Sequence, residues 1–261
     1  MNTPTNNDSG LTAALLEKMP AITLSEMENI RLMDRMDSKF VAPVSLLPQL
    51  LEAMLPCFKV QVNNDIRIAL YRTQYLDMPD LKMFLMHQNG KLNRQKIRIR
   101  SYVDSGLSFL EVKNKTNKGK TSKKRVPVGL SHLVSIGELK EEKHFLEENA
   151  LFDTDSLTPS LANDFKRMTF VNHKTTERIT IDMHLSFLNC RTGNAKTLDK
   201  LMIIELKQDS RQHSDFSEIL NHFRIKKISF SKYCMGTVLT DSHVKYNRFK
   251  GKWTIINKLI Q

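Results

Sequence analysis

The chain has 261 residues, 40% of them hydrophobic, so it can bury the core of one large domain or two small ones, which excludes disorder as its main state. The 40 Lys and Arg residues against 28 Asp and Glu give a formal net charge of +12, which favours an anionic partner. The 3 cysteines form no CxxC pair, and no HExxH, GxGxxG or GxxxxGK[ST] motif occurs. A disulfide framework, a zinc ribbon and the zincin, Rossmann and P-loop folds are therefore not supported.

The beginning of the chain is polar and lacks the basic start and apolar run of a signal peptide. No apolar run reaches the roughly 20 residues of a membrane span. We therefore expect a cytoplasmic protein with no membrane segment of its own. Residues 1–22 are expected to form a flexible leader, residues 23–245 a single folded domain, and residues 246–261 a tail.

The first predicted elements are two helices. A short helix is expected after residue 22, because Ser25 and Glu28 stand at capping-box spacing. Leucine and methionine recur at helical spacing over residues 45–55, which predicts an amphipathic helix that ends at Pro56.

Strands follow, marked by alternating apolar and polar residues and by a hairpin turn at Asp104-Ser105-Gly106. The predicted strands cover residues 35–42, 58–62, 67–76, 94–103, 108–116, 122–128, 165–172, 177–188 and 201–207. Further helices are predicted over residues 130–149, 215–223 and 231–239. This order of elements favours one α+β domain that is rich in antiparallel hairpins.

Most of the excess positive charge lies in one stretch. Between Lys91 and Arg125 the chain has twelve basic residues and two acidic ones. Residues two apart in a strand share a face, so Arg94, Lys96, Arg98 and Arg100 form a stripe of four cations with isoleucines on the opposite face. The next strand repeats the pattern with Glu111, Lys113 and Lys115.

A sheet with one face in water would give the same alternation. Like charges on adjacent paired strands are destabilising, however, unless an anion offsets their repulsion. Carboxylates stand among the cations, at Asp37, Glu111, Asp182 and Glu205. This mixture suits a polyphosphate with its divalent metal, because Arg and Lys hold phosphate oxygens and carboxylates hold Mg²⁺ or Mn²⁺. If the strands curl into a closed barrel, these charges face a lumen.

Nucleic acid is not the expected partner. Proteins that bind single strands place aromatic residues among the basic ones, whereas the basic stripes here have aromatics only at their ends, in Tyr102 and Phe109. In the basic loop between the two later strands of this region, Lys118 and Lys120 are expected to be solvated and without a role.

Several segments resemble a known family. They are RMDSKFV, TQYLDMPDL, HQNGKLNRQKIRIRSY, FLEVKNKTNKGKTSKKR, ERITIDMHL, IIELKQ and SFSKYCMG. In order and spacing the chain resembles, from about Ser25 to Leu239, the VTC domain, which is the polyphosphate polymerase branch of the triphosphate tunnel metalloenzymes. These enzymes also include CYTH-type phosphatases and cyclases. The resemblance implies an antiparallel β-barrel tunnel of about eight strands with helices packed outside, whose lumen binds a triphosphate and a divalent metal.

The resemblance and the charged stripes together give a set of expected site residues. Those expected to act on the reacting phosphates are Arg98, Arg100, Lys113, Arg178 and Lys232. Further phosphate-binding cations are expected at Lys39, Lys96, Lys124 and Arg167. The expected metal ligand is Glu205, with Glu111 and Asp182 as supporting carboxylates. Tyr75 and Asp77 are expected to organise the tunnel entrance and a strand end, and His87 to make a structural hydrogen bond.

The resemblance implies transfer of the ATP γ-phosphate onto a polyphosphate chain, with Mn²⁺ or Mg²⁺ as cofactor. The expected partners are ATP, inorganic polyphosphate and a pyrophosphate or phosphate primer. Two alternatives stay open: metal-dependent hydrolysis of tripolyphosphate or a nucleoside triphosphate, and non-catalytic polyphosphate binding.

Two departures from the family pattern bear on this choice. Arg35-x-Asp37-x-Lys39 has one acid where the ExExK pattern has two, which argues against the CYTH phosphatase arrangement. Ser229-Phe-Ser-Lys232 keeps one of the two lysines of the KFSK that some polymerases carry.

Overall fold

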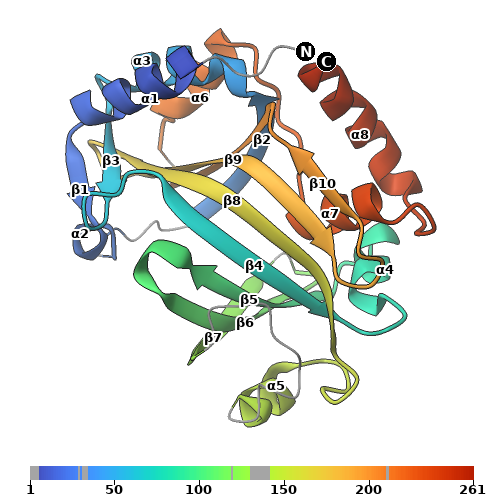
Figure 1. Cartoon of the computed structure of the whole chain (residues 1–261). Helices are drawn as coiled ribbons and strands as arrows, with labels where there is room; N and C mark the ends of the chain where they lie inside the picture. Colours follow the sequence, from blue (N-terminus) through green and yellow to red (C-terminus); the bar gives the residue numbers. More distant parts are fainter. Residues whose placement is uncertain (1–5, 29, 31–34, 119, 130–141, 210–211) are drawn as a thin grey trace.

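The computed structural model describes residues 6–28, 30, 35–118, 120–129, 142–209 and 212–261. It is an 11-stranded sheet with helices packed around it (Figure 1). The strands are β1 (Ala21–Thr23), β2 (Arg35–Pro43), β3 (Phe58–Val62), β4 (Ala69–Asp77), β5 (Arg94–Tyr102), β6 (Leu107–Lys115), β7 (Thr121–Val128), β8 (Thr158–Asn172), β9 (Glu177–Asn189), β10 (Ala195–Leu198) and β11 (Leu201–Asp209). The α-helices are α1 (Asn6–Lys18), α2 (Leu24–Glu28), α3 (Leu47–Met54), α4 (Lys82–Gln88), α5 (Lys143–Asn149), α6 (Asp215–His222), α7 (Lys232–Thr240) and α8 (Asn247–Ile260).

The main path of the sheet has the order β2-β11-β9-β8-β4-β5-β6-β7, and every pair along it is antiparallel. β3 and β10 add to β8 and β9, and β1 runs parallel to β3. Across the described residues no pairing joins β7 to β2, so the sheet is not closed. The predicted α+β class with an antiparallel sheet and helices outside is confirmed, and the sheet is curled but, within the described residues, does not close into a barrel (Figure 1). β7 stays an edge strand, and its exposed lysines are typical of a protected edge.

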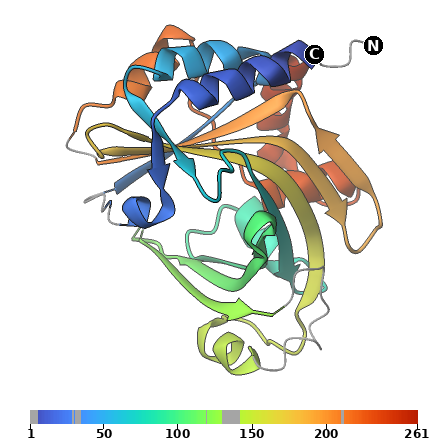
Figure 2. The same cartoon turned by 60° about the vertical axis from the view of Figure 1, so that its left-hand side comes forward.

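The long central strands are irregular at two points. The register of β8 and β9 shifts between Asp164 and Lys166, opposite His184, which has a φ of 51°. The register of β4 and β8 shifts between Tyr75 and Leu76. Bulges of this kind increase local twist and bend a sheet. Figures 1 and 2 show the result, a curved sheet in which β5, β6 and β7 bend away from β2, β9 and β11.

Much of the apolar core lies on the outer, convex side of this sheet, while a further cluster packs Tyr75 and Ile203 against Tyr233 of α7 on the other side. α1, α3 and α6 lie together over the strands at one end (Figure 2). Leu50, Leu51 and Met54 of α3 are fully buried there. At the other end, Ile97 and Leu110 pack with Leu146 of α5. Because the apolar residues of β5 and β6 face this side, the charged residues that alternate with them lie on the other one.

Both chain ends differ from the prediction. Residues 6–18 of the expected leader form α1, whose Leu15 and Leu16 are 3% and 2% exposed and belong to the same apolar cluster as α3. Most of the expected tail forms α8, which buries Phe249 and Ile256. The apolar residues of each helix become buried only because the rest of the chain supplies a surface to pack on.

Several boundaries are also corrected. β8 begins at Thr158, and β1, β10 and α4 were not predicted. The helix expected over residues 130–149 is present as α5, while residues 130–141 lie outside the described residues. The capping box of α2 uses Thr23 and Glu26: the Thr23 backbone N–H donates to Glu26 Oε2 at 2.7 Å, and the Glu26 N–H donates to Thr23 Oγ1 at 3.3 Å.

Candidate functional site

The strand pairing places nearly all predicted site residues on one face of the sheet. Residues directly opposite each other on antiparallel strands share a face. Following these pairs from Lys39 on β2 through Glu205, Thr180 and Thr169 leads across the sheet without a change of side. We call this the inner face. It carries Lys39, Lys96, Arg98, Arg100, Glu111, Lys113, Arg167, Arg178, Asp182 and Glu205.

The inner face is concave, since residues at its two ends act on each other. Lys113 on β6 lies within electrostatic range of Glu205 on β11 and Lys39 on β2. These strands are far apart in the sheet order. The predicted residues therefore surround a common space between β5–β7 on one side and β2, β9 and β11 on the other.

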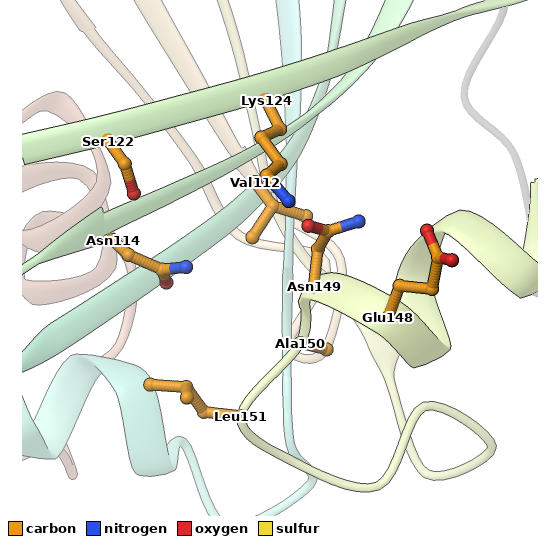
Figure 3. Close-up of a pocket in the computed structure, with 8 residues that line it drawn as sticks. All are labelled: Val112, Asn114, Ser122, Lys124, Glu148, Asn149, Ala150 and Leu151. Carbon is orange, nitrogen blue, oxygen red and sulfur yellow. The ribbon is translucent and has the colours of Figure 1, made fainter.

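Lys124 does not lie on the inner face. It is paired with Val112, whose side chain is buried in the outer core, whereas its neighbour Lys123 is paired with Lys113. The sequence prediction was off by one residue at this strand. Lys123 and Arg125 occupy the inner positions, and Lys124 lines a cavity on the opposite side of the sheet (Figure 3).

That outer cavity lies between β6, β7 and the end of α5, with a volume of about 330 Å³. Lys124, Asn114 and Ser122 point toward Asn149 and Leu151 across it (Figure 3). The cavity is separated from the inner face by the sheet itself, so it is not part of the candidate site.

Asp182 is held by two cations. Arg167 donates to both of its oxygens, from Nε to Oδ1 at 2.5 Å and from Nη2 to Oδ2 at 2.7 Å, and Lys232 donates to Oδ2. Burial would raise the pKa of Asp182, but Arg167 and Lys232 outweigh it and hold this pKa well below its usual range. Asp182 is therefore ionised and anchors both cations.

Glu111 has the same arrangement on β6. Arg98 Nη2 lies 2.6 Å from Oε2, and Lys123 Nζ lies 3.0 Å from Oε1. The Glu111 side chain is only 1% exposed. Burial alone would raise its pKa, but Arg98, Arg100 and Lys123 lower it to about 2.

Glu205 lies between two lysines. Lys39 donates to its Oε2, and Lys207 Nζ lies 3.3 Å from its Oε1. Burial opposes ionisation, yet Lys207 and Lys39 hold the pKa of Glu205 well below its usual range. At 20% exposure, its side chain is the most open of the three inner-face carboxylates that are held in this way.

Arg100 differs from its neighbours because no described carboxylate pairs with it. Its Nε is buried and has no hydrogen-bond partner. Burial and repulsion from Arg98 and Arg167 lower the pKa of Arg100, whereas the pKa values of Arg98 and Arg167, which are paired with carboxylates, are raised. A buried guanidinium with unused donors is the position that an anionic ligand would fill.

Two lysines of the inner face have unusually low pKa values. Burial, and repulsion from Arg98, lower the pKa of Lys113 to about 8, although part of its side chain is open to solvent. Burial also lowers the pKa of Lys232 to about 8, against the attraction of Asp182. A bound anion would raise both values.

Several of the cations make cation–π contacts with aromatic rings. The Arg100 and Arg167 guanidiniums lie 5.8 and 4.9 Å from the centre of the Tyr71 ring, and Lys232 Nζ lies 4.0 Å from that of Phe165. Tyr71 and Phe165 are stacked at 5.3 Å. Such contacts hold cations in place without neutralising them, so their charge stays available to a ligand.

Lys232 reaches the inner face because the start of α7 is fixed. The Ser231 side chain caps the helix by accepting from the Cys234 N–H at 3.2 Å, and it also accepts from Lys96 Nζ at 3.0 Å. The hydroxyl of Tyr233, the residue after Lys232, donates to Asp77. Asp77 also accepts from the backbone N–H groups of Met83 and Phe84 in α4 and of its neighbour Met78, so it organises a strand end as predicted.

The family model of the VTC domain matches residues 34–240, which is most of the chain and includes every strand of the curved sheet from β2 to β11. The chain belongs to the VTC domain family. The curated proteins include no match to it.

Solved structures similar to this VTC domain resemble it only remotely. The putative adenylyl cyclase HpAC1 from Hippeastrum, described as having a dominant triphosphatase activity, is 13% identical over 82% of this chain and 100% of its own, with a TM-score of 0.48. The PH1012 protein from Pyrococcus horikoshii is 9% identical over 72% and 88%, with a TM-score of 0.37. The Pct1 RNA triphosphatase of S. pombe is 7% identical over 100% and 94%, with a TM-score of 0.24. At these levels the similarities carry no functional argument.

The inner-face carboxylates Glu111, Asp182 and Glu205 of this VTC domain do not form a cluster. Within the described ranges, no group of three or more His, Cys, Asp or Glu residues lies close enough to hold a metal ion. All three carboxylates contact a cation with each oxygen, and Glu205 best fits a metal ligand because its side chain is 20% exposed, against 1% for Glu111 and 4% for Asp182. Mg²⁺ and Mn²⁺ sites commonly use one or two carboxylates and complete their coordination with substrate phosphates and water.

Some residues of the inner face were not among the predicted site residues. Lys207 follows Glu205 by two residues, so the alternation of β11 already placed it there. Lys123 and Arg125 needed the register of the β6–β7 hairpin, which the sequence does not reveal. Tyr71 needed the pairing of β4 with β8.

His87 makes the expected structural contact, with its Nδ1 3.1 Å from Cys234 Sγ. No described helix is both long and apolar enough to cross a bilayer.

Proposed function

We propose that this VTC domain is a polyphosphate polymerase, which binds a triphosphate and a polyphosphate chain against its inner face and transfers the γ-phosphoryl group of ATP onto the chain. The observation that carries the proposal is the surplus of positive charge on that face. Each of the three carboxylates is held by two cations, yet Lys96, Arg100 and Lys113 have no carboxylate partner within the described part of the chain. A linear polyanion supplies the missing negative charge.

In the proposed reaction, an oxygen of the terminal phosphate of the chain attacks the γ-phosphorus of ATP. The new P–O bond forms as the bond to the β–γ bridging oxygen breaks, and ADP leaves with that oxygen. The attacking phosphate is already ionised, so no strong general base is needed. The task of the protein is to align the reactants and stabilise charge on the transferring group.

The residues suited to this task are rigidly placed. Arg98 and Arg167 are fixed by Glu111 and Asp182, and Arg100 presents unused donors between them. Lys232 approaches from α7 on the Asp182 side. Because the cations are fixed before the substrate arrives, charge stabilisation costs little reorganisation.

A divalent cation fits this proposal at Glu205, whose carboxylate is ionised and the most open of those three. Mg²⁺ or Mn²⁺ bound there and to phosphate oxygens would supply further neutralisation of the transferring group. Lys39 and Lys207 fix the position of the Glu205 carboxylate, whose remaining lone pairs would bind such an ion.

Incubation of the pure protein with ATP and Mn²⁺, followed by sizing of the products on a gel, tests the proposal. We expect long-chain polyphosphate and ADP from the wild type and from Lys124→Gln, and at least roughly a hundredfold less from Arg98→Ala. Orthophosphate without chain growth would identify a hydrolase instead. Tight polyphosphate binding that survives Glu205→Gln, with no turnover of any triphosphate, would identify a binding module.

A further inference from the structure

A group of basic residues surrounds one end of the inner face, where β5 begins and β6 ends. Arg94 and Lys115 are directly opposite each other and continue the inner stripe beyond Lys96 and Lys113. Arg248 and Lys252 of α8 lie beside this end of β5. We call Arg94, Lys96, Lys115, Arg248 and Lys252 the basic rim.

The basic rim has no compensating negative charge. None of its residues forms an ion pair with a carboxylate of the described ranges: Lys96 donates to Ser231, and Lys252 donates to Ser229. Arg94 and Lys115 are directly opposite on paired strands, where like charges repel. No described carboxylate offsets this repulsion, so the positive charge of Arg94 and Lys115 is available to a ligand.

The effect of this charge is visible at His87, which lies among the rim residues. Burial, and repulsion from Lys96, Arg94, Lys252 and Arg248, lower its pKa to about 3. Four separate cations thus act on one imidazole, from a strand and from a helix that are far apart in the sequence.

The rim is also held in place by its backbone. The Asn117 N–H donates to Asn93 Oδ1 at 2.7 Å, which ties the β6–β7 turn to the start of β5. Gly90 has a φ of +72°, and a Cβ at this position would lie 2.3 Å from Nη1 of Arg248. Arg248 therefore packs directly over the loop that leads into β5.

We propose that the basic rim binds the part of a linear polyphosphate that extends beyond the inner face. This inference rests on the proposed function, and it adds a chain-length preference to it. Short chains such as tripolyphosphate contact only the inner-face cations, whereas a long chain also neutralises the rim. Lys115, at the end of the charged stripe of β6, then contributes to substrate binding.

The physical basis is the same as for other linear polyanions. Each cation that neutralises a phosphate releases condensed counterions, so affinity falls with salt, by a slope of about −0.7 per contact for single-stranded nucleic acids. Removing rim cations should therefore weaken long-chain binding and flatten its salt dependence, without an effect on tripolyphosphate.

The test compares Arg94→Gln/Lys115→Gln with Lys196→Gln/Lys200→Gln, which removes the same charge from exposed positions around β10. Binding of tripolyphosphate and of a long polyphosphate is measured at several salt concentrations. We expect the rim variant to bind the long chain about tenfold more weakly at low salt, with a salt slope shallower by about 1 to 1.5. Its tripolyphosphate affinity and the behaviour of the control variant should match the wild type. Lys115→Gln alone should show an intermediate loss, should the double variant fold poorly.

The outcomes separate the two proposals. If the wild type binds neither anion, the proposed function fails. If the wild type binds both and the rim variant behaves as the control, the rim inference is overturned while the inner-face site stands. An equal loss for a single-stranded oligonucleotide of the same charge would also overturn it, because the rim would then serve nucleic acid.

Discussion

Adjacent lysines on β7 provide a sharp test of the inner face. Lys123 and Lys124 are chemically identical neighbours, but Lys123 points to the inner face and Lys124 to the outer cavity. Substitution of each by Gln removes one charge from opposite sides of the same strand. We expect Lys123→Gln to weaken tripolyphosphate binding and Lys124→Gln to leave it unchanged.

The expected magnitude follows from the contact that is lost. Lys123 Nζ lies 3.0 Å from Glu111 Oε1, and the Glu111 side chain is 1% exposed while that of Lys123 is 41% exposed. A hydrogen bond between charged groups contributes about 1.5 to 3 kcal/mol, and the exposure of Lys123 reduces this to about 1 kcal/mol. A contact of the same strength between Lys123 and the ligand, lost in the variant, corresponds to a roughly fivefold change in affinity.

The assay is the rise in melting temperature that tripolyphosphate produces over a concentration series, which reports affinity through its stabilisation of the folded state. The unliganded melting temperatures of the two variants control for folding. Equal losses in both variants, or a larger loss in Lys124→Gln, would refute the assignment of faces.

Three further predictions test other parts of the site. The pKa of Lys232 is about 8 in the free protein, and a bound anion would raise it. Tripolyphosphate binding should therefore be accompanied by proton uptake near pH 8 and should weaken as pH rises from 7 to 9. Calorimetry in buffers of different ionisation enthalpy measures this uptake, and its absence would contradict the prediction. Tyr71→Phe should keep kcat, whereas Tyr71→Leu should lower it roughly tenfold through loss of two cation–π contacts, and an equal loss in both would show that the ring face is not what matters. Gly236→Ala would place a Cβ 2.5 Å from Leu161 Cδ2, so denaturant unfolding should show a loss of about 1 to 3 kcal/mol, and unchanged stability would contradict the position of α7.

Alternation alone was enough to group most of the site. Lys39, Arg98, Asp182 and Glu205 come from four strands, yet each could be assigned to the inner face because neighbouring positions in its strand are apolar and buried. A strand has only two faces, so one buried face determines the other.

Alternation could not assign the faces of β7, where three cations follow one another. Lys123, Lys124 and Arg125 offer no apolar neighbour to tell the faces apart, and a shift of one residue moves a side chain to the opposite side of the sheet. Only the pairing of β6 with β7 decides between them. The aromatic support from Tyr71 was beyond prediction for a related reason, since it depends on strands that are distant in the sequence.

The open edge and the two terminal helices were also beyond the sequence pattern. Closure of a barrel depends on whether the first and last strands meet, and no residue of β7 signals that. α1 carries Leu15 and Leu16 but little amphipathic character, so its burial depends on α3. Tertiary packing, rather than local preference, decides elements of this kind.

The most direct test of the central claim is a calorimetric titration of tripolyphosphate into the wild type, Arg100→Gln and Lys124→Gln. Arg100 is the buried inner-face guanidinium for which the described residues supply no carboxylate. We predict one site per chain, an affinity roughly 10- to 100-fold weaker in Arg100→Gln, and no change in Lys124→Gln. Wild-type affinity in Arg100→Gln, or no binding by the wild type, would contradict an anion-binding inner face.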